Sequence, residues 1–143
     1  ELARSLDRNK LNNEVWLAFF DAEDTGGLDG WEFIAGSQYM AQNLKTMPQA
    51  VIVVDMVGDA DQQIYKERNS SPALQDRLWA IAAKLGYEKY FIPTYKHAMI
   101  DEHTPFLQKG QTSGSNASIL RANRPPTGLP SIGTAPPVRS TRT

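Results

Sequence analysis

The chain has no cysteine among its 143 residues and only two histidines, His97 and His103. Without cysteine it can form no disulfide and no thiolate metal site, so any metal ion must be held by carboxylates, imidazoles and water. No apolar run approaches the roughly eighteen residues that a helix needs to cross a bilayer. The first residues also lack the pattern of a signal peptide. These absences predict no membrane span and leave the compartment open.

The chain also lacks a cluster of basic residues. Its net charge is −1, and residues 111–143 contain four arginines and no acid, so residues 1–110 carry −5. We therefore expect no nucleic-acid partner, because phosphate backbones bind to clustered lysine and arginine. An acidic body suits a metal site, although it is equally ordinary for an enzyme without one. The length and the 41% hydrophobic content suit a single globular core.

Acidic residues follow two apolar segments that have the composition of strands. Residues 15–20 lead into Asp-Ala-Glu-Asp at 21–24, and residues 50–54 lead into Asp55. A third acidic group, Asp-Glu-His at 101–103, follows later. Open α/β sheets build their sites outside the carboxyl ends of their strands, which favours a site made from these groups. Acidic turns and a helix-capping aspartate are the ordinary alternatives.

Four short motifs occur in series along the chain: Phe19-Phe-Asp-Ala-Glu-Asp24, Gly36-Ser37, Val54-Asp-Met-Val-Gly58 and Asp101-Glu-His-Thr-Pro-Phe106. In their order and approximate spacing they resemble the zinc-dependent aminopeptidase and glutaminyl-cyclase family of metallopeptidases. The resemblance covers about residues 1–110. It implies a hydrolase-like enzyme with one or two zinc ions, whose substrate is the N-terminus of a peptide or protein.

The resemblance also implies roles for individual acids. Glu23 matches the general base that shuttles protons, and Asp24 matches a zinc ligand. Asp55 matches a zinc ligand in two-metal aminopeptidases and a proton-network partner in one-zinc cyclases, and Asp101 matches an acid of that network. We therefore expect Glu23 and Asp101 to be catalytic and Asp24 and Asp55 to be metal ligands.

Trp31 and His103 are the candidate substrate-binding residues. Trp31 could line a pocket for an apolar substrate side chain, although a tryptophan in such a place is more often partly buried packing. The resemblance places His103 beside the site as a hydrogen-bonding or substrate-facing residue, with a purely structural role as the alternative. His97 is expected to be an ordinary loop histidine, and neither histidine is expected to bind metal.

Part of the family pattern is missing from this sequence. An upstream His and bridging Asp, and a downstream His ligand, have no counterpart here, so we expect a catalytic domain truncated at both ends. A catalytic zinc usually has three protein ligands, so this chain alone is expected to bind zinc weakly and to be inactive. The sequence does not decide between aminopeptidase and cyclase chemistry. The competing hypothesis is a peptidase-like scaffold or protein-binding module without metal.

Alternating strands and helices predict the fold. Ser71 and Pro72 are a good N-cap and first residue for a helix that Gly86 would end. Strands are expected over residues 14–21, 50–57, 62–67 and 90–93, and helices over residues 36–45 and 72–85. Such alternation predicts an α/β sandwich. Together with the family resemblance, this pattern predicts an incomplete three-layer sandwich in which helices flank a mixed, largely parallel sheet.

The composition changes at residue 111. Residues 111–143 contain five prolines, three glycines and ten serines or threonines. So few apolar residues do not offset the entropy lost on ordering the chain. We therefore expect a partial α/β domain over residues 1–110 and a disordered Ser/Pro/Arg-rich tail over residues 111–143, where the family usually has a buried strand.

Overall fold

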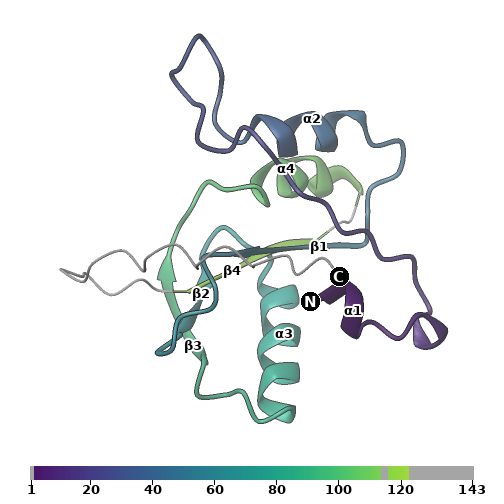
Figure 1. Ribbon diagram of the computed structural model, residues 1–143, viewed down its shortest axis with the longest axis vertical. Coiled ribbons are helices and arrows are strands. Elements are labelled where there is room, and N and C mark those ends of the chain that lie inside the picture. The colour runs from purple at the N-terminus through teal and green to yellow at the C-terminus, as the bar shows by residue number, and fades with distance from the viewer. Residues whose placement is uncertain (1, 114–115, 123–143) are drawn as a thin grey trace, which may run out of the picture.

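The computed structural model describes residues 2–113 and 116–122 (Figure 1). Their elements, in chain order, are α1 (Leu2–Ser5), a short 3-10 turn η1 (Arg8–Lys10), α2 (Ala35–Asn43), β1 (Ala50–Asp55), β2 (Ile64–Glu67), α3 (Pro72–Lys84), β3 (Phe91–His97), α4 (Thr104–Ser113) and β4 (Asn116–Arg121). No helix in this described part is both long and apolar enough to cross a membrane.

Two parallel strand pairs form the centre of the fold. β1 pairs with β4 in continuous register from Ala50 opposite Asn116 to Asp55 opposite Arg121. β2 pairs with β3 in parallel, with two register irregularities, and one antiparallel bridge joins β2 to the residue after β4. α2 and α4 lie on one side of the β1–β4 pair and α3 lies on the other (Figure 1). The prediction of an incomplete, layered α/β fold with largely parallel strands is therefore confirmed.

The helix over residues 72–85 begins and ends as its sequence predicts. The Ser71 hydroxyl accepts a hydrogen bond from a backbone N–H in the first turn of α3, and Pro72 occupies the first helical position. Gly86 follows in the left-handed conformation, with φ of 81°. On the buried face, the Trp79 indole donates to the Ile92 carbonyl at 2.9 Å. This bond fixes α3 against β3.

α2 and α4 enclose a core on the other side of the β1–β4 pair. Lys109 of α4 binds the C-terminal end of α2, where its ammonium group donates to the backbone carbonyls of Gln42, at 3.0 Å, and Leu44, at 3.4 Å. The two helices are thus joined at the end of α2 where its last carbonyls need donors. The core beneath them consists of Ala41, Phe106 and Ala117, with Phe20, Met40, Leu44, Met47, Val51 and Leu107 packed around it.

The strand expected over residues 14–21 is absent from the structure. This segment is irregular, and its apolar side chains are largely open to solvent, with Trp16 54% and Phe19 94% exposed. The sequence prediction was wrong here because an apolar run becomes a strand only where a neighbouring strand supplies its hydrogen bonds. No described strand pairs with this segment.

The expectation of disorder from residue 111 onward is wrong for the part of that segment that the structure describes. α4 continues to Ser113, and residues 116–121 form β4, in which Ala117 and Ile119 are almost completely buried. The average composition of 33 residues gave no sign of a six-residue strand within them. β4 is buried by β1 and the helices, and its own neighbours in sequence do not bury it. Residues 123–143 lie outside the described residues.

We predict that Ile119→Ala lowers the free energy of unfolding by about 2–4 kcal/mol, because the truncation leaves a cavity in a packed interior. Ile119 is 0% exposed, whereas Ile52, on the partner strand β1, is 45% exposed. Ile52→Ala is therefore the matched control and should cost less than about 1 kcal/mol. Urea denaturation of both variants measures the difference. Equal losses would show that β4 does not complete the core.

Candidate active site at the strand ends

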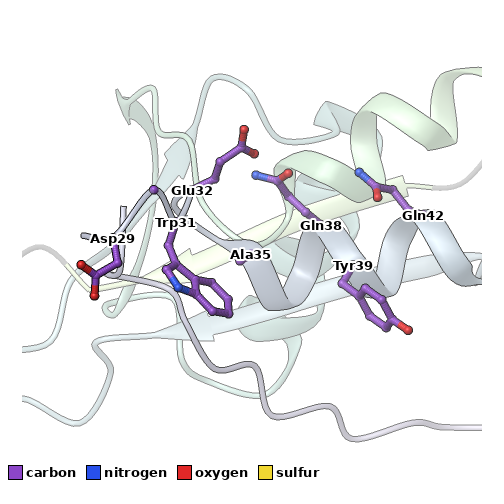
Figure 2. A pocket seen from close by; sticks show the side chains of 8 residues that line it. Asp29, Trp31, Glu32, Ala35, Gln38, Tyr39 and Gln42 are labelled. Atoms are coloured by element: carbon purple, nitrogen blue, oxygen red, sulfur yellow. The ribbon is translucent and has the colours of Figure 1, made fainter. Parts of the chain in front are cut away.

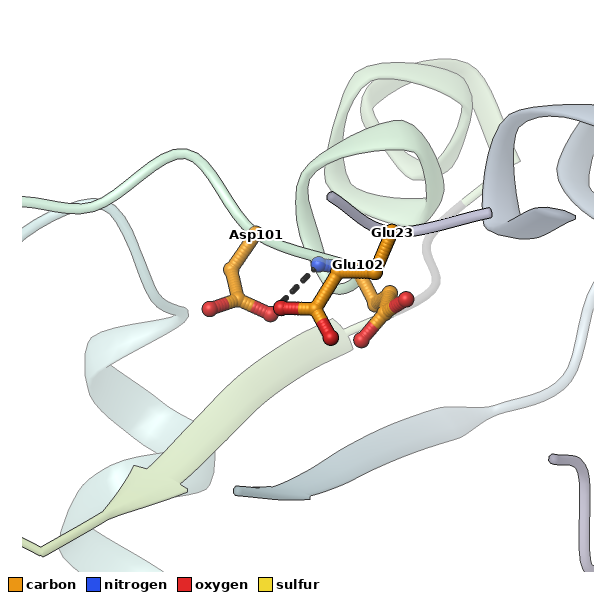
Figure 3. A group of neighbouring side chains, drawn as sticks. All are labelled: Glu23, Asp101 and Glu102. Atoms are coloured by element: carbon orange, nitrogen blue, oxygen red, sulfur yellow. Dashed lines mark hydrogen bonds between the residues drawn. The ribbon is translucent and has the colours of Figure 1, made fainter. Parts of the chain in front are cut away.

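Three carboxyl groups from two segments meet near the ends of β1 and β4. Oxygen atoms of Glu23, Asp101 and Glu102 all lie within 4.8 Å of one another (Figure 3). Asp101 and Glu102 are 3% and 8% exposed, and Glu23 is more open. We call these three residues the acid cluster.

The start of α2 holds Glu23 in place. The Ile34 N–H donates to the Glu23 carbonyl at 3.0 Å, and the next N–H donates to the carbonyl of the preceding residue at 3.3 Å. Gly36 allows this close approach, because a Cβ at that position would lie 2.7 Å from the Asp21 carbonyl oxygen. Gly36 of the Gly36-Ser37 motif therefore lets the backbone that carries Glu23 dock on the helix.

A turn before α4 holds the other two acids. The Thr104 N–H donates to the Asp101 carbonyl at 2.8 Å, and the Asp101 N–H donates to the Thr104 hydroxyl at 3.1 Å. One oxygen of the Asp101 carboxylate accepts the N–H of Glu102 at 2.8 Å (Figure 3). The second oxygen faces Arg121.

Arg121 joins the acid cluster to the end of β1. Its Nε lies 3.1 Å from Asp55 Oδ2, and its Nη1 lies 3.3 Å from Asp101 Oδ2. Asp55 and Arg121 are register partners at the ends of adjacent parallel strands, so their side chains leave the sheet on the same face. Arg121 was not among the site residues predicted from the sequence, since it lies in the segment that we expected to be disordered.

The pKa of Glu102 is raised to about 7. Burial is the largest cause, because it disfavours the charged carboxylate, and the negative charges of Glu23, Asp101, Asp55 and Asp24 add to it. Glu102 was not predicted from the sequence either. Its position between the predicted Asp101 and His103 is a signal that could have found it.

The pKa of Glu23 is also raised. Burial again comes first among the causes, followed by the charges of Asp101, Asp24 and Asp55, while Arg121 opposes them. A glutamate with a raised pKa exchanges protons closer to neutral pH than an ordinary glutamate does. The candidate proton shuttle therefore lies in surroundings that suit that role.

The two candidate metal ligands lie beside the acid cluster and not within it. Asp24 is exposed, and Asp55 is engaged by Arg121. Both still act on the cluster through their charges, which raise the pKa of Glu23 and of Glu102. The structure thus gathers all four predicted acids in one region and adds Glu102 and Arg121 to them.

His103 faces the protein interior. It is 0% exposed, and its Nε2 lies 3.4 Å from an oxygen of Glu67. Burial lowers the pKa of His103, although Glu67 and Asp101 oppose that shift. The pKa of Glu67 is lowered overall. Burial alone would raise it, but hydrogen bonds from the N–H groups of Asn69 and Met99, together with weaker contacts, lower it more. His103 is thus enclosed within the chain, and neither of its ring nitrogens makes a hydrogen bond within the described residues. Its expected role beside the site stays a prediction.

Trp31 lines two hollows near the start of α2. The first has a volume of about 390 Å³, and Figure 2 shows the Trp31 indole in it beside Ala35, with Tyr39 one turn further along the helix. The second, of about 570 Å³, is lined mainly by apolar side chains and includes Asp21, two residues before Glu23. Trp31 is 58% exposed, so its indole is accessible from outside.

A family comparison agrees with these motifs: the sequence pattern of peptidase family M28 matches residues 1–128. The chain belongs to peptidase family M28. The expectation drawn from the four motifs is therefore confirmed. No curated protein sequence matched the chain.

Several solved structures resemble this M28 chain. The glutaminyl cyclase of Porphyromonas gingivalis is 34% identical, with a TM-score of 0.62 over 71% of this chain and 38% of that one. A Zn-dependent exopeptidase from Parabacteroides distasonis is 27% identical, with a TM-score of 0.63 over 77% and 41%. A leucine aminopeptidase precursor from Bacteroides thetaiotaomicron is 27% identical, with a TM-score of 0.63 over 77% and 42%. The chain thus spans about two fifths of the length of these relatives.

The family and these neighbours point to zinc, and the acid cluster fits a divalent cation. It offers three carboxylate oxygens, two of them on buried residues, and burial together with the neighbouring negative charges raises the pKa of Glu102. Zinc accepts carboxylate ligands but usually takes imidazole as well. Within the described residues, the group contains no histidine nitrogen.

We predict that Glu102→Gln changes how stability depends on pH in metal-free buffer. The ordinary pKa of this carboxyl group is 4.5, and the folded chain raises it to about 7, so between these values the folded state binds more protons than the unfolded state. The free energy of unfolding of the wild type therefore falls as pH rises through this window, in total on the order of 2–3 kcal/mol. The neutral amide removes that loss.

Urea denaturation from pH 4 to pH 8 in the presence of a chelator measures this effect. The advantage of Glu102→Gln over wild type should grow with pH and level off above about pH 7. Glu88→Gln, at an exposed position, is the control and should keep the wild-type profile. Parallel profiles for Glu102→Gln and wild type would contradict the raised pKa.

Proposed function

We propose that this chain is part of a zinc metallopeptidase that acts at peptide N-termini, of the aminopeptidase or glutaminyl-cyclase type, with Glu23 as its proton-transfer group. The observation that carries the proposal is the position of Glu23 in the acid cluster, where burial and neighbouring carboxylates raise its pKa. Membership of family M28 and the likeness to glutaminyl cyclases and exopeptidases support it.

Glu23 would do the same work in either reaction. In peptide hydrolysis it takes a proton from the attacking water and returns it to the leaving amine. In cyclisation of an N-terminal glutamine it takes the proton of the attacking α-amine and passes it to the departing ammonia. Asp101 and Asp24 favour the protonated state of Glu23 and so help it to keep the proton between the two transfers.

Asp24 and Asp55 are the proposed metal ligands of this chain, with the acid cluster beside them. When bound, zinc would supply Lewis-acid polarisation of the substrate carbonyl. Trp31 is the proposed contact for the substrate side chain, because its exposed indole lines hollows beside the segment that carries Glu23. His103 is proposed to support the site from behind, through Glu67.

A non-catalytic scaffold is the second candidate. The observation that favours it is the pair of contacts from Arg121 to Asp55 and Asp101, which neutralise charge at the place where a metal would be expected. In that case the chain would keep the peptidase fold and bind a partner protein without catalysing a reaction.

A chimera can separate these two candidates. We predict that the Porphyromonas gingivalis glutaminyl cyclase, with its aligned segment replaced by that of this chain, cyclises an N-terminal glutaminyl peptide. Glu23→Gln in the chimera should lower kcat by about 100-fold or more, since a proton-transfer group is lost. Glu88→Gln should leave kcat unchanged. Full activity in the Glu23→Gln chimera would refute the role of Glu23, and a folded but inactive chimera would favour the scaffold.

For the chain alone, we predict weak zinc binding and no release of 4-nitroaniline from aminoacyl 4-nitroanilides. The reason is that its carboxylates supply only part of the ligand set that a catalytic zinc usually has. Titration calorimetry with zinc measures the binding. A tight one-to-one complex that Asp24→Ala abolishes would contradict the prediction and would mean that His97 or His103 has become a ligand.

A further inference from the structure

Arg121 occupies a special place in the fold. It is the last residue of β4, opposite the last residue of β1, and the turn before α4 brings Asp101 to the same point. Its side chain is 33% exposed, compared with 25% for Asp55 and 4% for Asp101. A cation is thus held between two partly or fully buried carboxylates by the pairing of two core strands.

The contacts of the guanidinium group are directional. Nε lies 3.1 Å from Asp55 and Nη1 lies 3.3 Å from Asp101, while Nη2 lies 2.8 Å from the sulfur of Met56 and Nη1 lies 3.9 Å from that of Met99. Four side chains therefore surround the guanidinium group: one from the end of β1, one from the residue after it, and two from the loop before α4.

Arg121 leaves the acid cluster only partly neutralised. Among the described residues, one ion pair reaches these acids, from Arg121 to Asp101, and the second ion pair of Arg121 goes to Asp55 beside them. Glu102 is about nine-tenths buried, and its carboxylate accepts no hydrogen bond from the described residues. Figure 3 shows that carboxylate directed toward Glu23 and Asp101. A buried carboxylate without a partner is costly, and a cation would relieve that cost.

We propose that Arg121 is a built-in cation that competes with divalent metal ions for Asp55 and Asp101, so that a metal ion binds these carboxylates only when the guanidinium group leaves them. The inference rests on the proposed function only in treating this region as the metal-binding surface. It goes further in assigning part of the expected weak metal binding to one residue. Missing ligands would also weaken binding, but that cause does not depend on Arg121.

Titration calorimetry with zinc, and separately with manganese, tests the proposal at neutral pH. Arg121→Met keeps a long apolar stem and removes the charge, and it should bind the metal about tenfold more tightly than wild type. Arg121→Lys keeps a positive charge and should bind close to wild type. Arg77→Met, on the exposed side of α3, is the control for loss of one positive charge elsewhere. The proposal is overturned if the affinity of Arg121→Met is equal to or below that of wild type for both ions.

A measurement on the wild-type chain covers the case in which Arg121→Met does not fold. The Nε–H proton of Arg121 should give a slowly exchanging NMR signal while it is paired with Asp55, and the competition requires this signal to shift or broaden as zinc is added. The signal of Arg68, an exposed arginine, is the internal control. An Arg121 signal that stays unchanged in excess zinc overturns the proposal.

Failure of this inference and failure of the proposed function give different results. If Arg121→Met gains affinity for manganese but not for zinc, the competition between Arg121 and metal ions is supported and the proposed zinc-dependent function is contradicted. If the chimera is active and depends on Glu23, but Arg121→Met gains affinity for neither ion, the proposed function stands and the role of Arg121 falls.

Discussion

The parallel pairing of β1 with β4 is the interaction on which the other features depend. It buries Ile119, gives α4 a surface to pack on, and brings Asp55 opposite Arg121 at the strand ends. Because Asp101 lies in the turn that leads into α4, and Arg121 of β4 binds its carboxylate, the same pairing also positions that acid. Without β4, β1 would have no strand partner among the described residues, and the acids would have no common support.

The acid cluster shows a balance between burial and charge. Carboxylates this close together raise one another's pKa, and the fold tolerates them because one arginine and a partly protonated Glu102 reduce the net charge. Such an arrangement is costly for stability, and sites with this kind of cost are typically functional. The motif residues expected from the sequence and the crowded carboxylates of the structure therefore lie in the same region.

The sequence was sufficient for the family, the layered fold and the positions of Glu23 and Asp101, because motifs and helix caps are local signals. It failed for β4, whose burial is supplied by β1 and the helices. It failed for Arg121 as a consequence, since no pattern within a segment shows which acid lies opposite its last residue. The opposite error occurred at residues 14–21, where a strand-like apolar run finds no pairing partner among the described strands.

The bond from Lys109 to the end of α2 has a consequence for sites far from it. Glu23 is docked on the first turn of α2, and Asp101 lies in the turn that leads into α4, so the distance between these two acids depends on how the two helices are aligned. The Lys109 ammonium group sets that alignment at the opposite end of α2, where helix carbonyls carry partial negative charge. The spacing of the carboxylates, and with it their proton affinity, is therefore controlled in part by a lysine that does not contact them.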